Sequence, residues 1–542
     1  MGAVLLLIAA GVVAFRATDK YFEMAKSLDV MAAVYRDLNS YYVDSLDPAA
    51  LMESGITAMT QGLDPYTVFY SEQHTNELLF QTTGQYAGIG ASFRLIGDSI
   101  VLSALFPDAP FAKAGFKPGD VLLGLDHQPV TGMDPEEVHA MLQGAPGSRL
   151  AVEVRRPWTG EVMKKEVERE IIAVSAIPYK TLLQDHIGYI CFQQFTKGCA
   201  EDLKAAVGQL KKEDPQLEGL IIDLRNNPGG LLGEAVKVSN FFLPEGDTIV
   251  SVKGRIPSWN AAYTASEKPL DTLLPLAVLI NGSSASAAEI FAGAMQDQDR
   301  AVIIGQQSFG KGLVQITRDL PYNTKLKLTV ARYYTPSGRC IQAIDYRHDG
   351  AMGGPVYIPD SLQQQFTTAD GRVVFDKGGI APDQTVDDSY LSHWASALIN
   401  DNVFFRFAAH YFYQHPQAPP LGEFTISDSL FTAFQDYVKQ YPLTYGSRSE
   451  MALDRFRASA ISEGYFDSVQ SVYDSLAASI SQFTQPALAA HRKEASQLLA
   501  AEIMNCYYVQ SGKIAVGIGT DRVIQEALTV LNHDKTYSAL LR

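Results

Sequence analysis

Apolar residues recur at helical spacing near the start of the chain. Between residues 19 and 83, apolar side chains such as Tyr21, Met24 and Leu28 follow one another at intervals of three or four residues. This spacing is typical of an amphipathic α-helix. A Gly-Leu-Asp-Pro-Tyr loop at residues 62–66 ends the pattern. We therefore expect a helical N-terminal region over residues 19–83.

The next segment, residues 84–172, alternates short β-like runs with turns rich in glycine and proline. Two stretches between these runs have helical character. Strands separated by such turns, with helices among them, predict a compact α+β module. The expected strands are Ser99–Leu105, Asp120–Leu125, Leu150–Arg155 and Val162–Glu168, and the expected helices are Pro110–Ala114 and Pro135–Gln143.

Strand-like and helix-like segments alternate from His186 to about Asp345, within a domain that we expect over residues 173–388. This order is typical of βαβ units and predicts an α/β core with a substantial parallel sheet. The expected strands are His186–Phe195, Leu217–Arg225, Leu274–Asn281 and Ala301–Gly305, followed by β-rich sequence to Tyr334. The expected helices are Ala200–Lys212, Leu231–Phe242 and Ala287–Gln296.

Residues 389–542 return to a helical pattern with many aromatic residues. Helical runs are expected around Leu430–Tyr441 and Val469–Met504. No group of chemically reactive residues stands out in this region. We therefore interpret it as a packing or oligomerisation domain rather than a second active site.

The first fifteen residues carry no charge, and Arg16 follows them. As a helix they span about 22 Å, which is short of a hydrocarbon core of about 30 Å. The length fits the apolar region of a signal peptide, although no Lys or Arg precedes it and no small-x-small cleavage site follows. We expect residues 1–18 to export the protein, either as a cleaved signal or as a retained membrane anchor. A buried N-terminal helix is the alternative.

Charge and composition exclude several functions. The chain has 44 Lys and Arg against 60 Asp and Glu, a net charge of −16. General nucleic-acid binding needs a basic surface, so no nucleic-acid partner is expected. The 4 cysteines form no CxxC or CxxH pair and the 10 histidines form no HExxH, so no metal site is expected.

The segment Asn-Gly-Ser-Ser-Ala-Ser-Ala-Ala-Glu at residues 281–289 is the first candidate for chemistry, because it joins an apolar strand to a helix. A serine there lies at the positive end of the helix, where unpaired backbone N–H groups can bind an oxyanion. Taken alone, a serine before a helix is more often only an N-cap.

Two further segments follow strands. Residues 305–312 read Gly-Gln-Gln-Ser-Phe-Gly-Lys-Gly, which nearly matches the phosphate-binding pattern GxxxxGK[ST]. Against a nucleotide site, Gly312 has no hydroxyl for Mg²⁺, and residues 313–317 alternate like a strand where a phosphate loop needs a helix. The third segment, Asp-Leu-Arg-Asn-Asn-Pro-Gly-Gly at residues 223–230, is a sharp turn whose glycines allow close approach to backbone N–H donors.

Together these segments resemble the active site of the C-terminal processing peptidases, a Ser-Lys family that includes the tail-specific protease. The resemblance implies that Ser286 is the nucleophile and that Lys311, twenty-five residues later, is the base. It implies that Gln315 orients the lysine amine, and that the core is a crotonase/ClpP-like α/β domain. The resemblance covers about residues 30 to 385, and its other matching segments are 223–230, 331–338 and 379–383.

The chemistry requires these residue types. A serine hydroxyl becomes a good nucleophile only when a neighbour accepts its proton. Lysine accepts a proton only when neutral, and burial can lower its pKa from about 10.4 by roughly 3–5 units. A Ser-Lys pair is a variant of the serine-protease triad and needs no histidine. The oxyanion donors are then expected to be the Ala287 N–H and one N–H from Gly229 or Gly230, and the sequence leaves that choice open.

Residues 84–172 resemble a PDZ domain. The carboxylate-binding loop of that family corresponds in position to Gly88, Ile89, Gly90 and Ala91, and residues 110–120 are similar to its A-x-x-A-G-x-x-x-G-D segment. A PDZ domain adds an incoming peptide to its sheet as a further strand and holds the terminal carboxylate on backbone N–H groups. The alternative is a β module that only stiffens the protease.

The sequence thus predicts a multidomain α/β serine endopeptidase: a peptidase core with an inserted PDZ-like domain, a helical N-terminal region and a mainly helical C-terminal extension. Its expected partners are proteins with unstructured or apolar C-terminal tails, and the resemblance implies no metal or organic cofactor. The N-terminal segment predicts a protease domain outside the cytoplasm, periplasmic or membrane-anchored, and a homo-oligomer stays open. The rival interpretations are a catalytically inactive PDZ scaffold, disfavoured by intact Ser286, Lys311 and Gln315, and an NTPase, disfavoured by Gly312.

Overall fold

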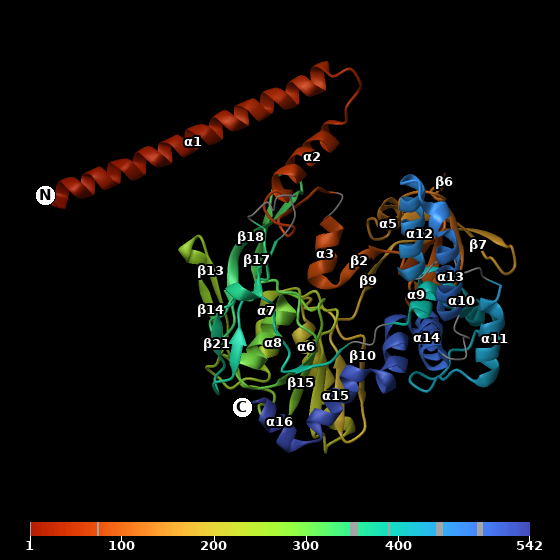
Figure 1. Cartoon of the computed structure of the whole chain (residues 1–542). Helices are drawn as coiled ribbons and strands as arrows, with labels where there is room; N and C mark the ends of the chain where they lie inside the picture. Colours follow the sequence, from red (N-terminus) through yellow and green to blue (C-terminus); the bar gives the residue numbers. More distant parts are fainter. Residues whose placement is uncertain (1, 73–74, 347–355, 388–390, 441–447, 485–490) are drawn as a thin grey trace. The chain divides into compact units, whose positions relative to one another are not determined.

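The structure is a computed structural model that describes residues 2–542 except 73–74, 347–355, 388–390, 441–447 and 485–490. For residues 2–20 it describes the backbone only. The chain divides into two compact units. The smaller unit comprises Met1–Thr75, Gln315–Val330 and Tyr346–Gly354, and the larger unit comprises Asn76–Val314, Ala331–Asp345 and Pro355–Arg542. Figure 1 traces the helices and strands along the chain.

The smaller unit contains the N-terminal helices and a short sheet. α1 spans Gly2–Tyr41, and α2 spans Pro48–Gln61. β1 (Val68–Tyr70) pairs antiparallel with the first residues of β18 (Lys325–Tyr334), which also pairs with β17 (Leu313–Asp319). The N-terminal region therefore differs from the wholly helical expectation, because β1 finds its backbone partners in a strand far later in the sequence.

No helix in the described part of the chain has an apolar stretch long enough to cross a membrane. The structure does not describe the side chains of residues 1–18, the segment that we expect to export the protein. The role of residues 1–18 therefore stays a prediction.

The peptidase core in the larger unit is a six-stranded sheet of order β10-β11-β12-β15-β16-β23. All neighbouring strands run parallel except β10, which is antiparallel to β11. Its strands are β10 (Tyr179–Leu182), β11 (Ile187–Cys191), β12 (Gly219–Asp223), β15 (Leu276–Ile280), β16 (Val302–Gly305) and β23 (Gln384–Thr385). β12 and β15 are buried at every residue, as is typical of parallel strands covered on both faces. The predicted α/β core with a parallel sheet is confirmed.

Helices cover both faces of this sheet. Ile221 and Leu279 pack on one face against Ala527 and Leu528 of α15. On the other face, a Cβ added to Gly188 would lie 3.1 Å from the Leu210 side chain of α6, so that helix approaches β11 closely. The core helices are α6 (Cys199–Glu213), α7 (Leu232–Asn240), α8 (Ala287–Asp297) and α15 (Arg522–Leu531).

Short strands that the sequence did not predict complete the core. The end of β18 pairs with β13, which pairs with β14. Two further pairs are β19 with β20 and β21 with β22. Their bounds are β13 (Thr248–Gly254), β14 (Ala261–Thr264), β19 (Ile344–Asp345), β20 (Val356–Tyr357), β21 (Gln365–Thr367) and β22 (Val373–Phe375).

The inserted α+β module has a sheet of order β3-β4-β5-β7-β8, with β6 paired to β5. The predicted strands Ser99–Leu105 and Val162–Glu168 coincide with β4 and β8. The other elements are α3 (Thr75–Thr83), β2 (Gln85–Gly88), β3 (Ala91–Ile96), α4 (Pro110–Lys113), β5 (Val121–Leu125), β6 (Gln128–Pro129), α5 (Pro135–Leu142), β7 (Arg149–Arg155) and β9 (Glu170–Ala173). β2 pairs with β9 outside this sheet, so it joins the two ends of the module.

The C-terminal region is helical, as expected. Helices α10, α11 and α14 share a core of aromatic and aliphatic side chains. Tyr441 and residues 485–490, which fall in the two expected helical runs, lie outside the described residues. The helices are α9 (His393–Asn400), α10 (Val403–Gln414), α11 (Asp428–Val438), α12 (Arg448–Ser462), α13 (Phe466–Thr484), α14 (Arg492–Gly517) and α16 (Asp534–Leu540).

Candidate active site

Four loops leave the parallel sheet of the core at its carboxyl edge. At this edge Cys191 pairs with Asp223 and Ile280 pairs with Gly305. Because these strands are parallel and in register, the segments that follow them start side by side. In open α/β sheets this edge is where ligands bind and reacting groups gather. The loops that start there are residues 192–198, 224–231, 281–286 and 306–312.

Ser286 is the residue immediately before α8, and its backbone is strained. Its dihedral angles are φ 56° and ψ −115°. Few non-glycine residues adopt a positive φ, and such strain is concentrated at functional sites. The Ser286 side chain is partly exposed and lies at the N-terminus of α8, where the helix macrodipole favours developing negative charge.

The two neighbouring serines have different environments. Ser284 is fully buried, and its hydroxyl donates to the Leu224 carbonyl oxygen at 2.7 Å. Ser283 is exposed and lies in the turn before the helix. Of the three serines, only Ser286 combines partial exposure with a strained backbone at the start of α8.

The Glu289 carboxylate links the loop of Ser286 to the loop of Lys311. It is fully buried and accepts the N–H groups of Ser286 (2.8 Å), Lys311 (2.9 Å) and Gly310 (2.7 Å) and the hydroxyl of Ser308 (2.5 Å). The Ser286 and Lys311 N–H groups bind the same oxygen, Oε2, so the backbones of these two residues lie side by side. Burial raises the pKa of Glu289 to about 7, and its hydrogen-bond donors partly offset the rise.

Tyr333, at the end of β18, makes a second bridge between the same two loops. Its hydroxyl donates to the Lys311 carbonyl oxygen at 2.6 Å and lies 3.3 Å from the Ser286 carbonyl oxygen. The side chain is buried. Two independent groups, one carboxylate and one phenol, therefore hold Ser286 and Lys311 together.

The turn after β12 packs directly against Ser286. A Cβ added to Gly229 would lie 2.8 Å from both the Ser286 Cβ and the Ala287 nitrogen, so only glycine fits. The Gly229 N–H donates to the side-chain oxygen of buried Asn227 at 2.8 Å. Among the described residues, the N–H groups of Ala287 and Gly230 have no hydrogen-bond acceptor. Ala287, which follows Ser286, and Gly230, which follows Gly229, thus each have an unused N–H donor.

Gln315 lies on β17, four residues beyond Lys311, and belongs to the smaller unit. Its side-chain amide donates to the Thr329 hydroxyl at 3.2 Å, and that hydroxyl donates to Asp64 at 3.1 Å. Its expected role beside the lysine amine stays a prediction. The strand that follows Lys311 agrees with the expected alternation, where a phosphate-binding loop would need a helix.

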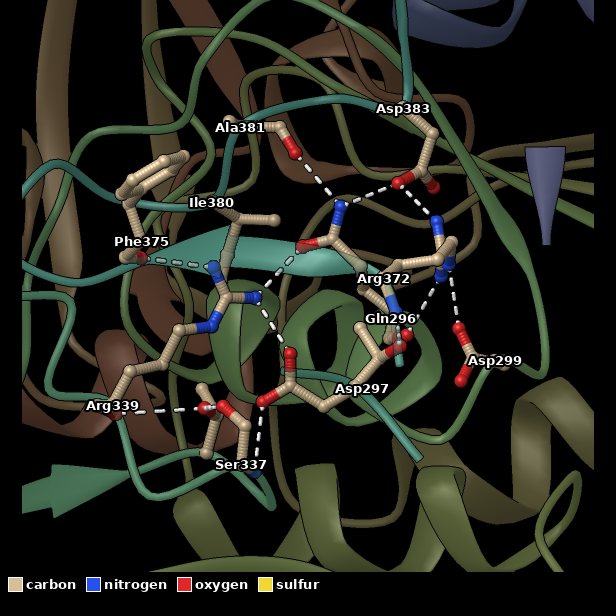
Figure 2. A network of polar contacts seen from close by, with 12 residues as sticks. Gln296, Asp297, Asp299, Ser337, Arg339, Arg372, Phe375, Ile380, Ala381 and Asp383 are labelled. Carbon is tan, nitrogen blue, oxygen red and sulfur yellow. Dashed lines mark hydrogen bonds and ion pairs between the residues drawn. The ribbon is translucent and has the colours of Figure 1, made fainter. Parts of the chain in front are cut away.

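The C-terminal end of α8 is fixed by a network of buried polar side chains (Figure 2). Asp297 and Arg339 form an ion pair at 2.7 Å, with side-chain exposures of 0% and 1%. Asp383 accepts the Gln296 amide at 2.8 Å and pairs with Arg372 at 2.6 Å. The Gly-Ile-x-Pro-Asp segment that contains Asp383 therefore anchors the helix that follows Ser286.

Residues 88–91 form the turn between β2 and β3 in the inserted module. Gly90 has φ 67°, and a Cβ there would lie 2.2 Å from the Ala109 Cβ, so the turn requires glycine. Burial raises the pKa of Tyr86 to about 12, and a hydrogen bond from the Gly90 N–H to its hydroxyl partly offsets the rise. Ile89 belongs to the core of the module, while Ala91 begins β3. β3 ends the strand order, so one of its edges is unpaired among the described strands.

Sequence reasoning did not assign roles to Glu289, Asn227 or Tyr333. Each lies inside one of the segments that resemble the peptidase family. The signal that could have identified these residues was therefore a polar side chain at a fixed position within a matching segment. Their roles depend on hydrogen bonds between loops, which motif spacing alone does not specify.

Comparison with known proteins gives matches to three family models. The model described as Peptidase family S41 matches residues 186–350, and the PDZ domain model matches residues 103–156. The model described as Probable PDZ-protease, C-terminal helical domain, matches residues 394–531.

Named relatives share most of the chain. A carboxy-terminal-processing protease of Bartonella bacilliformis is 34% identical over 358 residues, which cover 66% of this chain and 81% of that protein. A probable CtpA-like serine protease of Staphylococcus epidermidis is 30% identical over 350 residues, covering 62% and 69%. Among solved structures, a photosystem II D1 C-terminal processing protease is 25% identical, covers 66% of this chain and 92% of its own, and has a TM-score of 0.36.

Proposed function

We propose that this chain, which belongs to peptidase family S41, cleaves proteins near their C-termini with Ser286 as nucleophile and Lys311 as general base. It is a carboxy-terminal-processing serine protease with a PDZ domain. One observation carries the residue assignment: the N–H groups of Ser286 and Lys311 donate to the same oxygen of buried Glu289. A nucleophile and its base must be held in one geometry, and this carboxylate holds both backbones.

In this mechanism the neutral Lys311 amine takes the proton of the Ser286 hydroxyl as Oγ attacks the scissile carbonyl. The ammonium then gives the proton to the leaving amine, which departs as the new N-terminus of the released fragment. In the second half of the reaction the same amine removes a proton from the water that attacks the acyl-enzyme, and the ammonium returns that proton to Ser286 Oγ as the ester bond breaks.

The N–H groups of Ala287 and Gly230 serve as oxyanion donors in this proposal. The support is that both lack an acceptor among the described residues, whereas the Gly229 N–H is used by Asn227. Gly229 instead supplies space, since a Cβ there would collide with Ser286 and Ala287. Such preorganised donors stabilise the tetrahedral intermediate more strongly than water does.

The PDZ domain recognises the C-terminal tail of the substrate. An extended tail adds to the unpaired edge of β3, and its carboxylate binds the turn of residues 88–91. The Gly90 N–H donates a hydrogen bond to the neutral Tyr86 hydroxyl. When a substrate tail binds, its charged carboxylate replaces this hydroxyl as the acceptor. Hydrogen bonds to a charged acceptor are stronger, which favours the exchange.

Residues 1–18 carry the protease domain out of the cytoplasm, as a signal or an anchor. The support is their lack of charge over the first fifteen positions. Cell fractionation of the full chain and of a chain lacking residues 1–18 tests this, and identical distributions would contradict it.

The residue assignment is tested with an unstructured protein that ends in an apolar free carboxylate. Ser286→Ala and Lys311→Ala are each expected to lower the cleavage rate by roughly 10⁴-fold or more, because nucleophile and base act as one unit. Ser283→Ala is the matched control, since Ser283 is exposed in the same loop, and it should keep wild-type activity. Substantial cleavage by purified Ser286→Ala would overturn the assignment.

A further inference from the structure

The PDZ sheet is buried on both of its faces along β4 and at the start of β5. Side chains alternate between faces along a strand, and Ile100 and Leu102 of β4 belong to the core of the domain itself. Val101 of β4 and Val121 of β5 lie on the opposite face, where they pack against Phe405 and Ala409 of α10. Both valines are only 8% exposed. The C-terminal helices therefore cover an apolar surface that an isolated PDZ domain would expose to water.

A tryptophan from the PDZ domain stacks on two rings of α10. Trp158, in the turn between β7 and β8, stacks on His410 and Tyr413 with ring centroids 5.6 Å apart in both pairs. Gly119 makes room for it, since a Cβ there would lie 2.2 Å from the indole and 3.0 Å from the Ala409 Cβ. Stacked aromatic pairs add specific geometry to the apolar contact.

The edge strand of the PDZ sheet is held by α14. Both carboxylate oxygens of Glu502 accept the Arg94 guanidinium, at 2.9 and 3.1 Å. The guanidinium also lies 4.7 Å above the ring of Phe405. Arg94 is on β3, the strand that the proposed function assigns to the substrate tail. The Arg94–Glu502 ion pair therefore connects α14 to the strand that is proposed to bind the tail.

Helix α14 is interrupted at Val509, and the chain that follows this helix contacts the peptidase core. Val509 has φ 54° and ψ −135° inside the helix, a conformation that a β-branched residue rarely adopts. After the helix, Asp521 caps α15 and pairs with Arg225 at 2.8 Å. Arg225 belongs to the turn of residues 223–230, which carries Gly229 and Gly230. One continuous stretch of chain thus contacts both the tail-binding strand and the turn beside Ser286.

We propose that the helical domain of residues 394–531 positions the PDZ domain for cleavage, with Trp158, Arg94 and Glu502 as positioning residues. The domain holds β3 at a fixed place relative to the turn of residues 223–230, so that a bound tail leads its scissile bond toward Ser286. This rests on the proposed function in so far as β3 receives the tail. Loss of the contact leaves tail binding intact but uncouples it from cleavage, because small displacements of a reacting group cost large factors in rate.

The test uses the full chain and two measurements. The first is the Kd of a fluorescent peptide with a free apolar C-terminus. The second is the ratio of kcat/KM for an unstructured protein with that free C-terminus to kcat/KM for the same protein amidated. Trp158→Ala and Glu502→Gln are expected to lower this ratio by roughly tenfold while Kd and cleavage of the amidated protein stay unchanged.

Two control variants separate positioning from a general loss of structure. Trp158→Phe keeps an aromatic ring in the stack and should keep the wild-type ratio. Glu463→Gln removes an exposed carboxylate of the same helical domain and should also leave the ratio unchanged. If Trp158→Ala fails to fold by circular dichroism, Glu502→Gln decides the question.

Three outcomes overturn the proposal. An unchanged ratio in the folded variants would show that the contact does not direct the tail, and a raised ratio would show that it restrains the PDZ domain instead. A ratio of one in the wild type would remove tail recognition by the PDZ domain and the positioning role with it. That last failure is seen without any variant, so it is distinguishable from a failure of positioning alone.

Discussion

Glu289 is subject to two opposing requirements. Burial raises its pKa to about 7, so the folded protein keeps this carboxyl neutral at pH values where the unfolded chain ionises it. The resulting stabilisation is present below the unfolded value of 4.5 and is lost as pH rises through about 7. The ionised form, however, is the one that accepts all four hydrogen bonds around Ser286 and Lys311. At a pH above about 7, Glu289 is therefore ionised and can accept all four hydrogen bonds, but the free energy of unfolding is lower.

We predict that Glu289→Gln lowers kcat by roughly 10²-fold with a smaller effect on KM, because the amide donates hydrogen where the carboxylate accepts N–H groups. The melting temperature of the wild type should fall relative to that of the variant as pH rises between about 5 and 8. Thermal unfolding of both proteins over this range provides the measurement. Parallel curves would show that Glu289 does not titrate there.

The cleavage rate should rise with pH over the neutral range, because in the proposed mechanism only the neutral Lys311 amine accepts the Ser286 proton. Chelators should have no effect. Initial rates with one tailed substrate, measured with and without EDTA, check both statements. A rate that falls between about pH 6 and 8, or that EDTA abolishes, contradicts a lysine-based mechanism.

At the scale of secondary-structure elements, the turn after β12 packs tightly against the start of α8. A Cβ on Gly229 would lie 2.6 Å from the Ala285 carbonyl oxygen, so Gly229→Ala must push the turn away from Ser286. We predict a loss of roughly 10²-fold in kcat, measured with the tailed substrate.

Gly233 provides the matched control for that substitution. It lies in α7, and a Cβ there would meet nothing within 4 Å. Alanine is favoured over glycine in a helix by about 0.5–1 kcal/mol, so Gly233→Ala should keep full activity and melt at the same or a higher temperature. Equal losses in both variants would refute the steric explanation for Gly229.

Element boundaries could be predicted where local chemistry sets them. Gly97 and Pro107 lie two residues outside the two ends of β4, and Gly160 lies two residues before β8; both strands were placed correctly from the sequence. The strand β3 was not predicted, although Ala-Ser-Phe-Arg-Leu alternates apolar and polar residues, because the preceding segment had been interpreted as a binding loop.

The break at Val509 was not predicted, although Ser511 and Gly512 form a pair that is common at helix kinks. Gly512 comes so close to the Met504 carbonyl oxygen that a Cβ would lie 2.3 Å from it.

The candidate site was predictable in its residue types but not in its connections. Motif spacing identified Ser286 and Lys311 as candidates, because their chemistry restricts the residues that can occupy those positions. The convergence of four donors on Glu289 could not be predicted, since three of them come from a loop about twenty residues later. Which atoms meet in space is decided by packing.

In the whole molecule, tail recognition and peptide hydrolysis belong to different domains, so each can be tested separately. One unstructured substrate is compared in three forms, ending in an apolar free carboxylate, in an amide, or in Asp-Asp. We predict fastest cleavage of the first form, because in the proposed function the turn of residues 88–91 binds the terminal carboxylate and the edge of β3 pairs with the extended tail. Equal rates for all three would mean that the module is only a structural cover.

The ion pair between Arg225 and Asp521 also concerns how the protease is made. Ser286 and Lys311 leave the ribosome long before Asp521, the partner that holds the turn beside Ser286. At about 5–20 residues per second, synthesis of the intervening chain takes on the order of ten seconds or more. During that interval the growing chain holds the proposed nucleophile and base but lacks α15 against the sheet. Translation itself is thus expected to delay activity, while unfolded segments of the enzyme are still within reach of Ser286.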